Sequence, residues 1–239
     1  MCVVRFSMLS LFLIAFTLTP GVNAQTADRS GVQTAGQPSA SQLGADGSLI
    51  LAPSPEDQAK YQGFLKQPDS GLCKVVPREK YKNEIPVRGG GSNYSFVRLT
   101  HEYGFGSEIG FEDGKLYTSF GDDDLGLISS IGDVPIEEVD LNNPAANFLA
   151  YYTVPQAEPD ARAESRRISD GIEGGGLVFR PMADATVNTT YVMRAVEYGR
   201  ADVLAVFRVV GQDTDGSLTI LWRILQRFPT PMLINPDQM

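Results

Sequence analysis

Short runs of β-branched and aromatic residues follow one another through most of this chain after about Gly71. Clusters of glycine, proline, asparagine and aspartate separate them, and these residues supply the backbone conformations that turns need. Strand-forming runs at such close spacing are typical of all-β domains. We therefore expect a mainly β fold: a single antiparallel β-sandwich or barrel. The eleven expected strands are residues 72–76, 94–103, 107–112, 115–120, 125–131, 138–141, 148–154, 177–180, 186–198, 203–212 and 217–228.

Two segments interrupt this pattern. Ser54, followed by Pro55 and two acidic residues, predicts the start of a short N-terminal helix, because a hydroxyl cap, an early proline and acids in the first turn all favour helix initiation. Residues 159–168 are crowded with charge and contain few large apolar residues. They predict a solvated helix or a mobile excursion, and nothing in their sequence assigns them a binding role.

The last three expected strands form a C-terminal three-strand meander. Asp215-Gly216 between two apolar runs is a strong hairpin signal, since both turn residues accept positive φ. A two-residue turn there places Arg208 opposite Arg223 when residues are counted back along both strands. A loop centred on Ala201 would likewise place Arg194 opposite Arg208. The sequence therefore predicts a row of three arginines across neighbouring strands.

Strand alternation separates the two faces of this meander. The face opposite the arginines is the expected core and comprises Tyr191, Met193, Phe207, Val209, Ile220, Trp222 and Ile224. The arginine face also carries valine and leucine, so it is not a plain solvent face. Guanidinium groups side by side in a sheet repel one another and require anions or water.

Two interpretations of Arg194, Arg208 and Arg223 remain open. In the first, acidic residues of this chain neutralise them, and the available carboxylates are those of Asp122–Asp124, Glu137, Glu138 and Glu197. In the second, the three arginines form a strip that binds a ligand carrying a carboxylate or phosphate.

The N-terminus predicts export. Arg5 precedes an apolar run, and Val22-Asn23-Ala24 offers small residues where a signal peptidase cuts. Residues 1–24 are therefore an expected signal peptide, and the protein is expected to be secreted or periplasmic. Residues 25–48 lack bulky apolar side chains and predict a flexible linker. One β-rich domain at 49–234 and a tail at 235–239 complete the expected organisation, with no transmembrane segment after the leader.

Net charge and cysteine content limit the classes of partner and the covalent cross-links that this chain can have. The net charge of −9 disfavours nucleic acid, because phosphate backbones would be repelled. Cys73 is the only cysteine after the leader, so it predicts a small buried hydrophobe and no internal disulfide. Nothing in the sequence calls for a cofactor.

Few residues are equipped for catalysis. His101 is the only histidine, which excludes sites built from several histidines and predicts a surface or hydrogen-bonded structural role. Asp122, Asp123 and Asp124 are the candidate metal ligands, because clustered side-chain oxygens suit calcium. The many acidic residues leave a carboxylate pair for hydrolysis open.

These observations favour a non-catalytic extracytoplasmic module that binds an unknown small-molecule or protein ligand. The alternatives are an exported hydrolase that uses paired carboxylates and a purely structural envelope component.

Overall fold

The structure, a computed structural model, describes residues 48–101, 106–121 and 124–234. The chain divides into two compact units, Met1–Ser39 and Ala40–Met239, and every described residue belongs to the second. The predicted leader, nearly all of the predicted linker, the predicted tail, Asp122 and Asp123 lie outside the described residues.

The fold is mainly β, with 38% of the described residues in strands and 23% in helices, and every described pairing between strands within a sheet is antiparallel. The larger sheet has the order β1 (Ser70–Val75), β11 (Leu218–Arg227), β10 (Ala201–Gln212), β9 (Thr189–Glu197) and β5 (Leu125–Gly132). The smaller sheet has the order β2 (Asn93–Tyr94), β3 (Ile109–Glu112), β4 (Lys115–Tyr117) and β8 (Met182–Asp184). β6 (Ile172–Gly174) and β7 (Leu177–Phe179) form a separate hairpin, and no sheet closes as a barrel within the described part of the chain.

One hydrophobic core is shared by the two larger sheets. The face of β9, β10 and β11 that was predicted to be the core carries Tyr191, Met193, Phe207, Val209, Ile220, Trp222 and Ile224, and all of them are in this core. The smaller sheet and its flanking residues contribute Tyr94, Phe96, Ile109, Phe111 and Leu116 to the same core. The predicted side-chain alternation of the meander is therefore confirmed.

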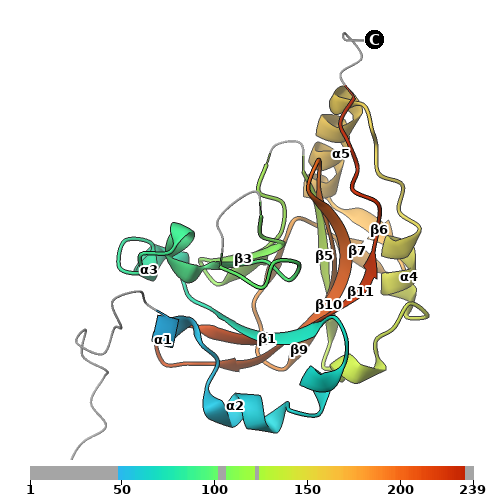
Figure 1. The fold of residues 1–239 in the computed structure, drawn as a ribbon. Coiled ribbons are helices and arrows are strands. Elements are labelled where there is room, and N and C mark those ends of the chain that lie inside the picture. Colours follow the sequence, from blue (N-terminus) through green and yellow to red (C-terminus); the bar gives the residue numbers. More distant parts are fainter. Residues whose placement is uncertain (1–47, 102–105, 122–123, 235–239) are drawn as a thin grey trace, which may run out of the picture. The chain divides into compact units, whose positions relative to one another are not determined.

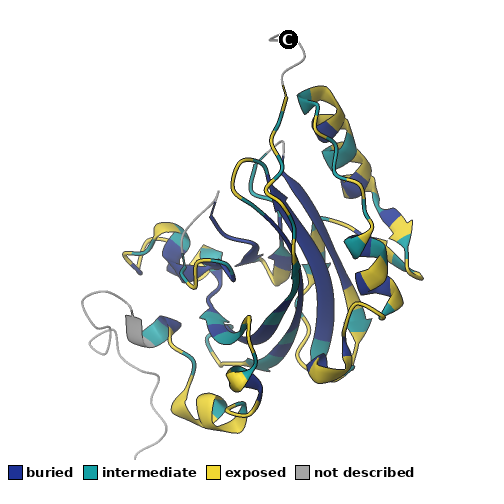
Figure 2. Cartoon of the chain, turned by 45° about the vertical axis from the view of Figure 1, so that its right-hand side comes forward, coloured by how far each residue is buried: buried dark blue, intermediate teal, exposed yellow. Residues whose placement is uncertain are grey.

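The arginine face of the larger sheet is covered as well. Helices α4 (Pro144–Ala150) and α5 (Glu158–Asp170) lie on this side together with β6 and β7 (Figure 1). Leu149, Ile168 and Phe179 pack there against Val192 and Leu204 of the sheet. Figure 2 accordingly shows the long central strands buried, whereas much of α5 is exposed. The central strands thus have an apolar core on both faces.

Shorter helical segments complete the described chain. They are α1 (Ser48–Leu51), α2 (Pro55–Lys60), η2 (Phe64–Lys66), α3 (Arg78–Tyr81), η3 (Arg88–Gly91) and η4 (Ile136–Glu138). The predicted N-terminal helix is confirmed as α2, because the Ser54 hydroxyl accepts a hydrogen bond from the Asp57 N–H at 3.0 Å and Pro55 occupies the first turn. No helix among the described residues has the length and apolar character to cross a membrane.

Three of the expected strands are wrong in whole or in part. Residues 138–141 lie at and after the end of η4, and residues 148–154 begin inside α4. Asn143 starts α4 by accepting hydrogen bonds from the backbone N–H groups of Ala145 and Ala146, which overrides the β propensity of the aromatic residues that follow. The expected strand 94–103 ends at Tyr94, because Ser95 begins a tight turn in which Leu99 has a φ of 56°.

The β10–β11 turn is longer than predicted. The N–H of Asp213 donates to the carbonyl of Ser217 at 2.8 Å, and the N–H of Gly216 donates to the carbonyl of Asp213 at 2.9 Å. Gly216 has a φ of 92°. This is a three-residue loop in which a left-handed glycine follows a type I turn.

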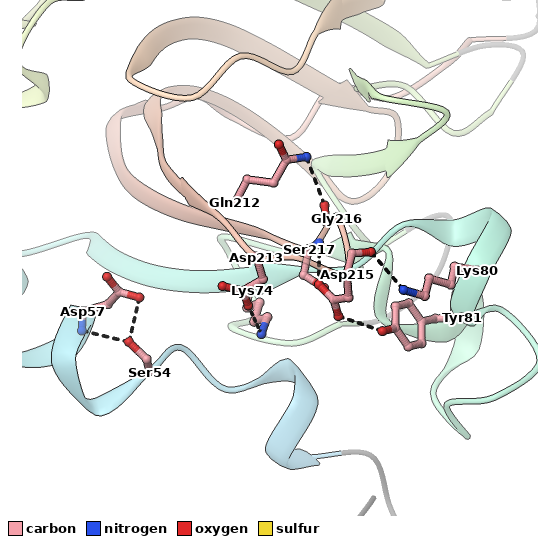
Figure 3. A network of polar contacts seen from close by, with 10 residues as sticks. All are labelled: Ser54, Asp57, Lys74, Lys80, Tyr81, Gln212, Asp213, Asp215, Gly216 and Ser217. Carbon is pink, nitrogen blue, oxygen red and sulfur yellow. Dashed lines mark hydrogen bonds and ion pairs between the residues drawn. The ribbon is translucent and has the colours of Figure 1, made fainter. Parts of the chain in front are cut away.

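Neighbouring segments hold this turn in place (Figure 3). The Asp215 carboxylate accepts hydrogen bonds from the Tyr81 hydroxyl at 2.7 Å and from the Ser217 N–H at 2.8 Å. Lys74 forms an ion pair with Asp213 at 2.5 Å. Burial alone would raise the pKa of Asp215, but the hydrogen bonds from Tyr81 and Ser217 lower it below its ordinary value.

The predicted arginine row is wrong because both hairpins have a different register. Arg208 lies opposite Leu221, and Arg223 lies opposite Val206. The β9–β10 turn is centred on Gly199, whose φ is 73°, so Arg194 lies opposite Leu204. The longer β10–β11 loop together with the bulge between Val209 and Gly211 shifts one pairing by two residues, and the turn centred on Gly199 in place of Ala201 shifts the other by four. Both shifts are even, so they move the arginines apart yet keep them on the predicted face.

Candidate functional site

Arg194 is completely engaged by the protein itself. Its Nε and Nη2 donate to the two carboxylate oxygens of Asp202 at 2.8 and 2.7 Å. Its Nη1 donates to the carbonyls of Leu149 and Tyr152 at 2.7 and 2.8 Å, and the Phe228 ring lies 3.7 Å from the guanidinium carbon. Both members of the ion pair are buried. Because Leu149 belongs to α4, the hydrogen bond to its carbonyl connects α4 to the sheet.

Arg208 is bound at the edge of the same face. It forms an ion pair with Asp133, and its Nη1 donates to the carbonyl of Val134 and to the Thr190 hydroxyl, both at 3.0 Å. Asp133 is largely exposed, whereas the arginine side chain is mostly covered. Arg208 therefore holds the segment after β5 against β9 and β10.

Arg223 differs from the other two because it forms no ion pair with a carboxylate of the described residues. Its Nη1 donates to the Gln67 side-chain oxygen at 3.0 Å, and its Nη2 donates to the Val139 carbonyl at 2.7 Å. It lines a small hollow of about 360 Å³ together with Asp69 and Asp140. The Asp140 carboxylate keeps a lowered pKa mainly through hydrogen bonds from Asn142, with a smaller contribution from Arg223.

The acids that the sequence analysis named are not the ones that bind these arginines. Asp202 and Asp133 form the ion pairs, and backbone carbonyls accept most of the remaining hydrogen bonds. The structure does not bring Arg194, Arg208 and Arg223 together as a strip, and a ligand-binding role for them stays a prediction.

A second and larger hollow lies between α5 and the smaller sheet. It has a volume of about 760 Å³. One wall is the face of α5 formed by Arg162, Ser165, Arg166 and Ser169, which are spaced so that they share one side of the helix. The other wall comprises Glu112, Asp113, Lys115, Tyr117, Thr118, Ser119, Gly121, Pro181 and Met182. We call this hollow the α5–β4 groove.

The helical wall is polar and basic. Arg166 is exposed and forms no hydrogen bond or ion pair with any described residue. Arg162 donates to Glu158 at 2.9 Å on the same helix. The hydroxyl of Ser169 donates to the carbonyl of Ser165 at 3.0 Å, one turn earlier. The helix thus presents guanidinium groups and hydroxyl groups to the groove.

The opposite wall combines an aromatic side chain with charges. The Tyr117 ring lies so close to Gly110 that a β-carbon there would be 2.3 Å from it. The Tyr117 hydroxyl donates to the Asn93 side-chain oxygen at 2.9 Å, which fixes the ring against the outer face of β3. Met182 is paired with Tyr117 across the strands and is 53% exposed. Lys115 forms an ion pair with Asp184 at 2.6 Å.

A second group of titratable residues is buried near the ends of the strands. Glu108 and Glu197 are each 2% exposed, and Asp124 is 5% exposed. The pKa of Glu197 is raised to about 8, mainly by burial and to a smaller extent by the negative charges of Glu108 and Asp124, while Arg200 and Arg98 oppose the rise.

Glu108 is hydrogen-bonded, whereas one oxygen of Glu197 is not. The Glu108 carboxylate accepts from the N–H of Phe96 at 2.5 Å and from the Ser95 hydroxyl at 3.2 Å. Burial nevertheless raises its pKa. Oε1 of Glu197 is buried with no hydrogen-bond partner among the described residues. Both carboxyl groups are thus almost entirely covered by the rest of the protein.

The remaining candidates are structural where the structure describes them. His101 Nε2 is 2.7 Å from the carbonyl of Lys74, its ring packs edge-on against Tyr94, and burial lowers its pKa. Cys73 is buried and reduced, as predicted. Of the predicted metal ligands, only Asp124 is described, and its Oδ1 accepts from the N–H of Tyr198 at 3.3 Å. No group of three or more potential ligands that could hold a metal occurs within the described ranges.

Comparison with known proteins finds no matching family model, no matching curated protein and no matching solved structure. The site must therefore be argued from its own chemistry.

Sequence reasoning did not identify the α5–β4 groove. The i, i+3, i+4, i+7 spacing of Arg162, Ser165, Arg166 and Ser169 is visible in the sequence. It indicates a polar helix face, but a solvent-facing helix has the same spacing. Only the position of α5 across the hollow from β4 distinguishes a groove wall from a solvent-facing helix.

Proposed function

We propose that this chain is a binding module that holds a small ligand in the α5–β4 groove. The observation that carries this proposal is the Arg166 guanidinium, which lines this groove and has no partner among the described residues. Guanidinium groups are usually satisfied by carboxylates or phosphates, and ligand pockets of about 300–1,000 Å³ are common. A hollow of this size beside an unpaired guanidinium is a fitting place for a ligand.

The proposal includes export and a sandwich-type architecture. The predicted leader at residues 1–24 supports a secreted or periplasmic location. The core shared by the two larger sheets supports the sandwich arrangement rather than the barrel. An unknown small molecule remains the expected partner.

The hydrolase alternative rests on one observation, the raised pKa of Glu197 beside Glu108. A general acid needs such a pKa, but it must also reach a substrate. Both side chains are 2% exposed, so this function ranks second.

A groove-filling substitution tests the proposed function. Ser165→Trp would occupy the groove, whereas Ala163→Trp places the same side chain on the exposed side of α5. The wild-type protein would be melted with citrate, inorganic phosphate, neutral sugars and acidic sugars. A compound near a hundredfold its Kd should raise the Tm by about 5–10 °C.

We expect at least one of these compounds to raise the Tm of the wild type and of Ala163→Trp, but not that of Ser165→Trp. If no compound raises the Tm, or if Ser165→Trp responds like the wild type, the groove is not the binding site.

A further inference from the structure

We infer that the groove binds an acidic saccharide, a short sugar chain carrying carboxylate groups. This inference rests on the proposed function and names its ligand class. The groove offers three kinds of contact that such a ligand needs: a fork for the carboxylate, hydroxyl groups for the sugar hydroxyls, and an aromatic surface for the ring.

The carboxylate is assigned to Arg166. Its guanidinium provides a planar fork that matches a carboxylate through two parallel hydrogen bonds. Arg162, one turn earlier on the same face, adds positive charge. At the other wall, Glu112 and Asp113 carry negative charge and would repel an anion. A ligand anion is therefore directed toward the α5 wall.

Hydroxyl groups line the groove beside this fork. Ser165 and Ser169 stand one turn apart on α5, and Thr118 and Ser119 line the opposite wall. Thr118 is 1% exposed and its hydroxyl oxygen is buried, so the other three hydroxyls are the ones that a ligand can reach. Hydroxyls both donate and accept, so they suit a ligand that carries many hydroxyls of its own.

Tyr117 and Met182 give the groove an apolar part. Tyr117 is anchored by Asn93 and packed on Gly110, so its ring orientation is fixed. An aromatic ring with a polar tip offers an apolar surface next to polar groups. A pyranose has the matching form, because its faces carry C–H groups and its rim carries hydroxyls. A small polycarboxylate without rings would leave this surface unused.

The charge of the whole chain limits how acidic the ligand is. At a net charge of −9, the protein repels long polyanions. A short chain with a few carboxylates satisfies Arg166 without that penalty, and the groove volume of about 760 Å³ suits two or three sugar units.

The test uses trigalacturonic acid as the probe and its methyl ester as the neutral match. Titration calorimetry with the purified full-length protein should show binding of the acid, with the ester at least about tenfold weaker. Arg166→Gln should weaken binding of the acid at least about tenfold as well. Arg88→Gln, which removes an equal charge from an exposed position outside the groove, should bind like the wild type.

Citrate separates this inference from the proposed function. If citrate binds in the groove as tightly as the acid, the saccharide assignment is wrong. If the methyl ester does so, the carboxylate assignment to Arg166 is wrong. In either case the groove remains a binding site. If neither acid, ester nor citrate binds, or if binding of the acid persists in Ser165→Trp, the inference fails together with the groove as its site.

Discussion

At the scale of single residues, the arginines of the larger sheet hold the structure together through ion pairs and hydrogen bonds. Arg194 and Asp202 are both buried and bonded through two parallel hydrogen bonds. An arginine in a strand predicts that an acidic residue lies nearby. Which acidic residue this is depends on the register of the hairpin, which the sequence pattern did not give. The neutralising aspartate lies on the next strand, only eight positions along the chain.

Arg194→Ala should destabilise the protein by about 3–5 kcal/mol, because it leaves the Asp202 charge buried and unpaired. The measurement is urea unfolding at neutral pH. Arg227→Ala breaks an ion pair with Asp69 that is about half exposed, and it should cost about 0–1 kcal/mol. Equal losses in the two variants would contradict the burial argument.

Glu197 should give the protein a measurable pH dependence. Its folded-state pKa is raised to about 8 by burial and by Glu108 and Asp124, against the opposing charges of Arg200 and Arg98. In the unfolded chain the pKa is near its ordinary value of about 4.3. The folded state therefore holds a proton that the unfolded state has lost, and this contribution to stability is complete below that value and is lost as the pH rises through about 8.

Glu197→Gln mimics the protonated carboxyl. Between about pH 5 and 8 its unfolding free energy should fall less than that of the wild type, and above pH 8 it should be the more stable by at least about 1 kcal/mol. Glu173→Gln, at an exposed position, should follow the wild type. Parallel stability profiles for wild type and Glu197→Gln would show that Glu197 binds no extra proton in the folded state.

At the scale of elements, the turns determined the register of strand pairing, which the alternation along the strands does not encode. Alternation along β9, β10 and β11 identified the core face correctly, because a shift by an even number of residues leaves each side chain on its face. The partner opposite each arginine was wrong, because the β10–β11 loop has one extra residue and a bulge lies next to it in β10, and because the β9–β10 turn is centred two residues earlier than predicted. Alternation in the sequence therefore predicts reliably which face of the sheet a side chain occupies, but it predicts poorly which residues pair across neighbouring strands.

Gly216 carries the left-handed conformation that closes the β10–β11 loop. Gly216→Ala should destabilise the protein by about 1 kcal/mol or more, because φ is 92° and a β-carbon would lie 3.1 Å from Pro77. Gly63→Ala is the matched control: its φ is −64°, a β-carbon there meets nothing within 4 Å, and it should stabilise by about 0.4–1 kcal/mol. Urea midpoints of the two variants should move in opposite directions, and a shift in the same direction would contradict this assignment.

The two helices α2 and α4 differ in how far their local sequence predicts them. Ser54 and Pro55 were sufficient to predict α2, because its cap is a local hydrogen bond. α4 was missed although Asn143 and Pro144 carry a similar signal, because Phe148 and Tyr152 in the following segment favour strands when considered alone. In the structure these side chains pack against the second core, where a helix serves as well as a strand.

At the scale of the whole molecule, the central strands lie between two layers. The smaller sheet covers one face, while α4, α5 and the β6–β7 hairpin cover the other (Figure 1). This double covering explains why the arginine face is apolar between its charges. It also places α5 beside β4, which creates the groove that the proposed function uses.

The amino-acid sequence by itself determined the mainly β class, the buried face of the last three strands, the burial of Cys73, and the start of α2. Each of these depends on composition, alternation or a contact between near neighbours. The tertiary structure alone decided the register of the arginines, the buried carboxylates around Glu197 and the α5–β4 groove. Those features join segments far apart in the chain, and no local pattern encodes which distant surface a side chain will meet.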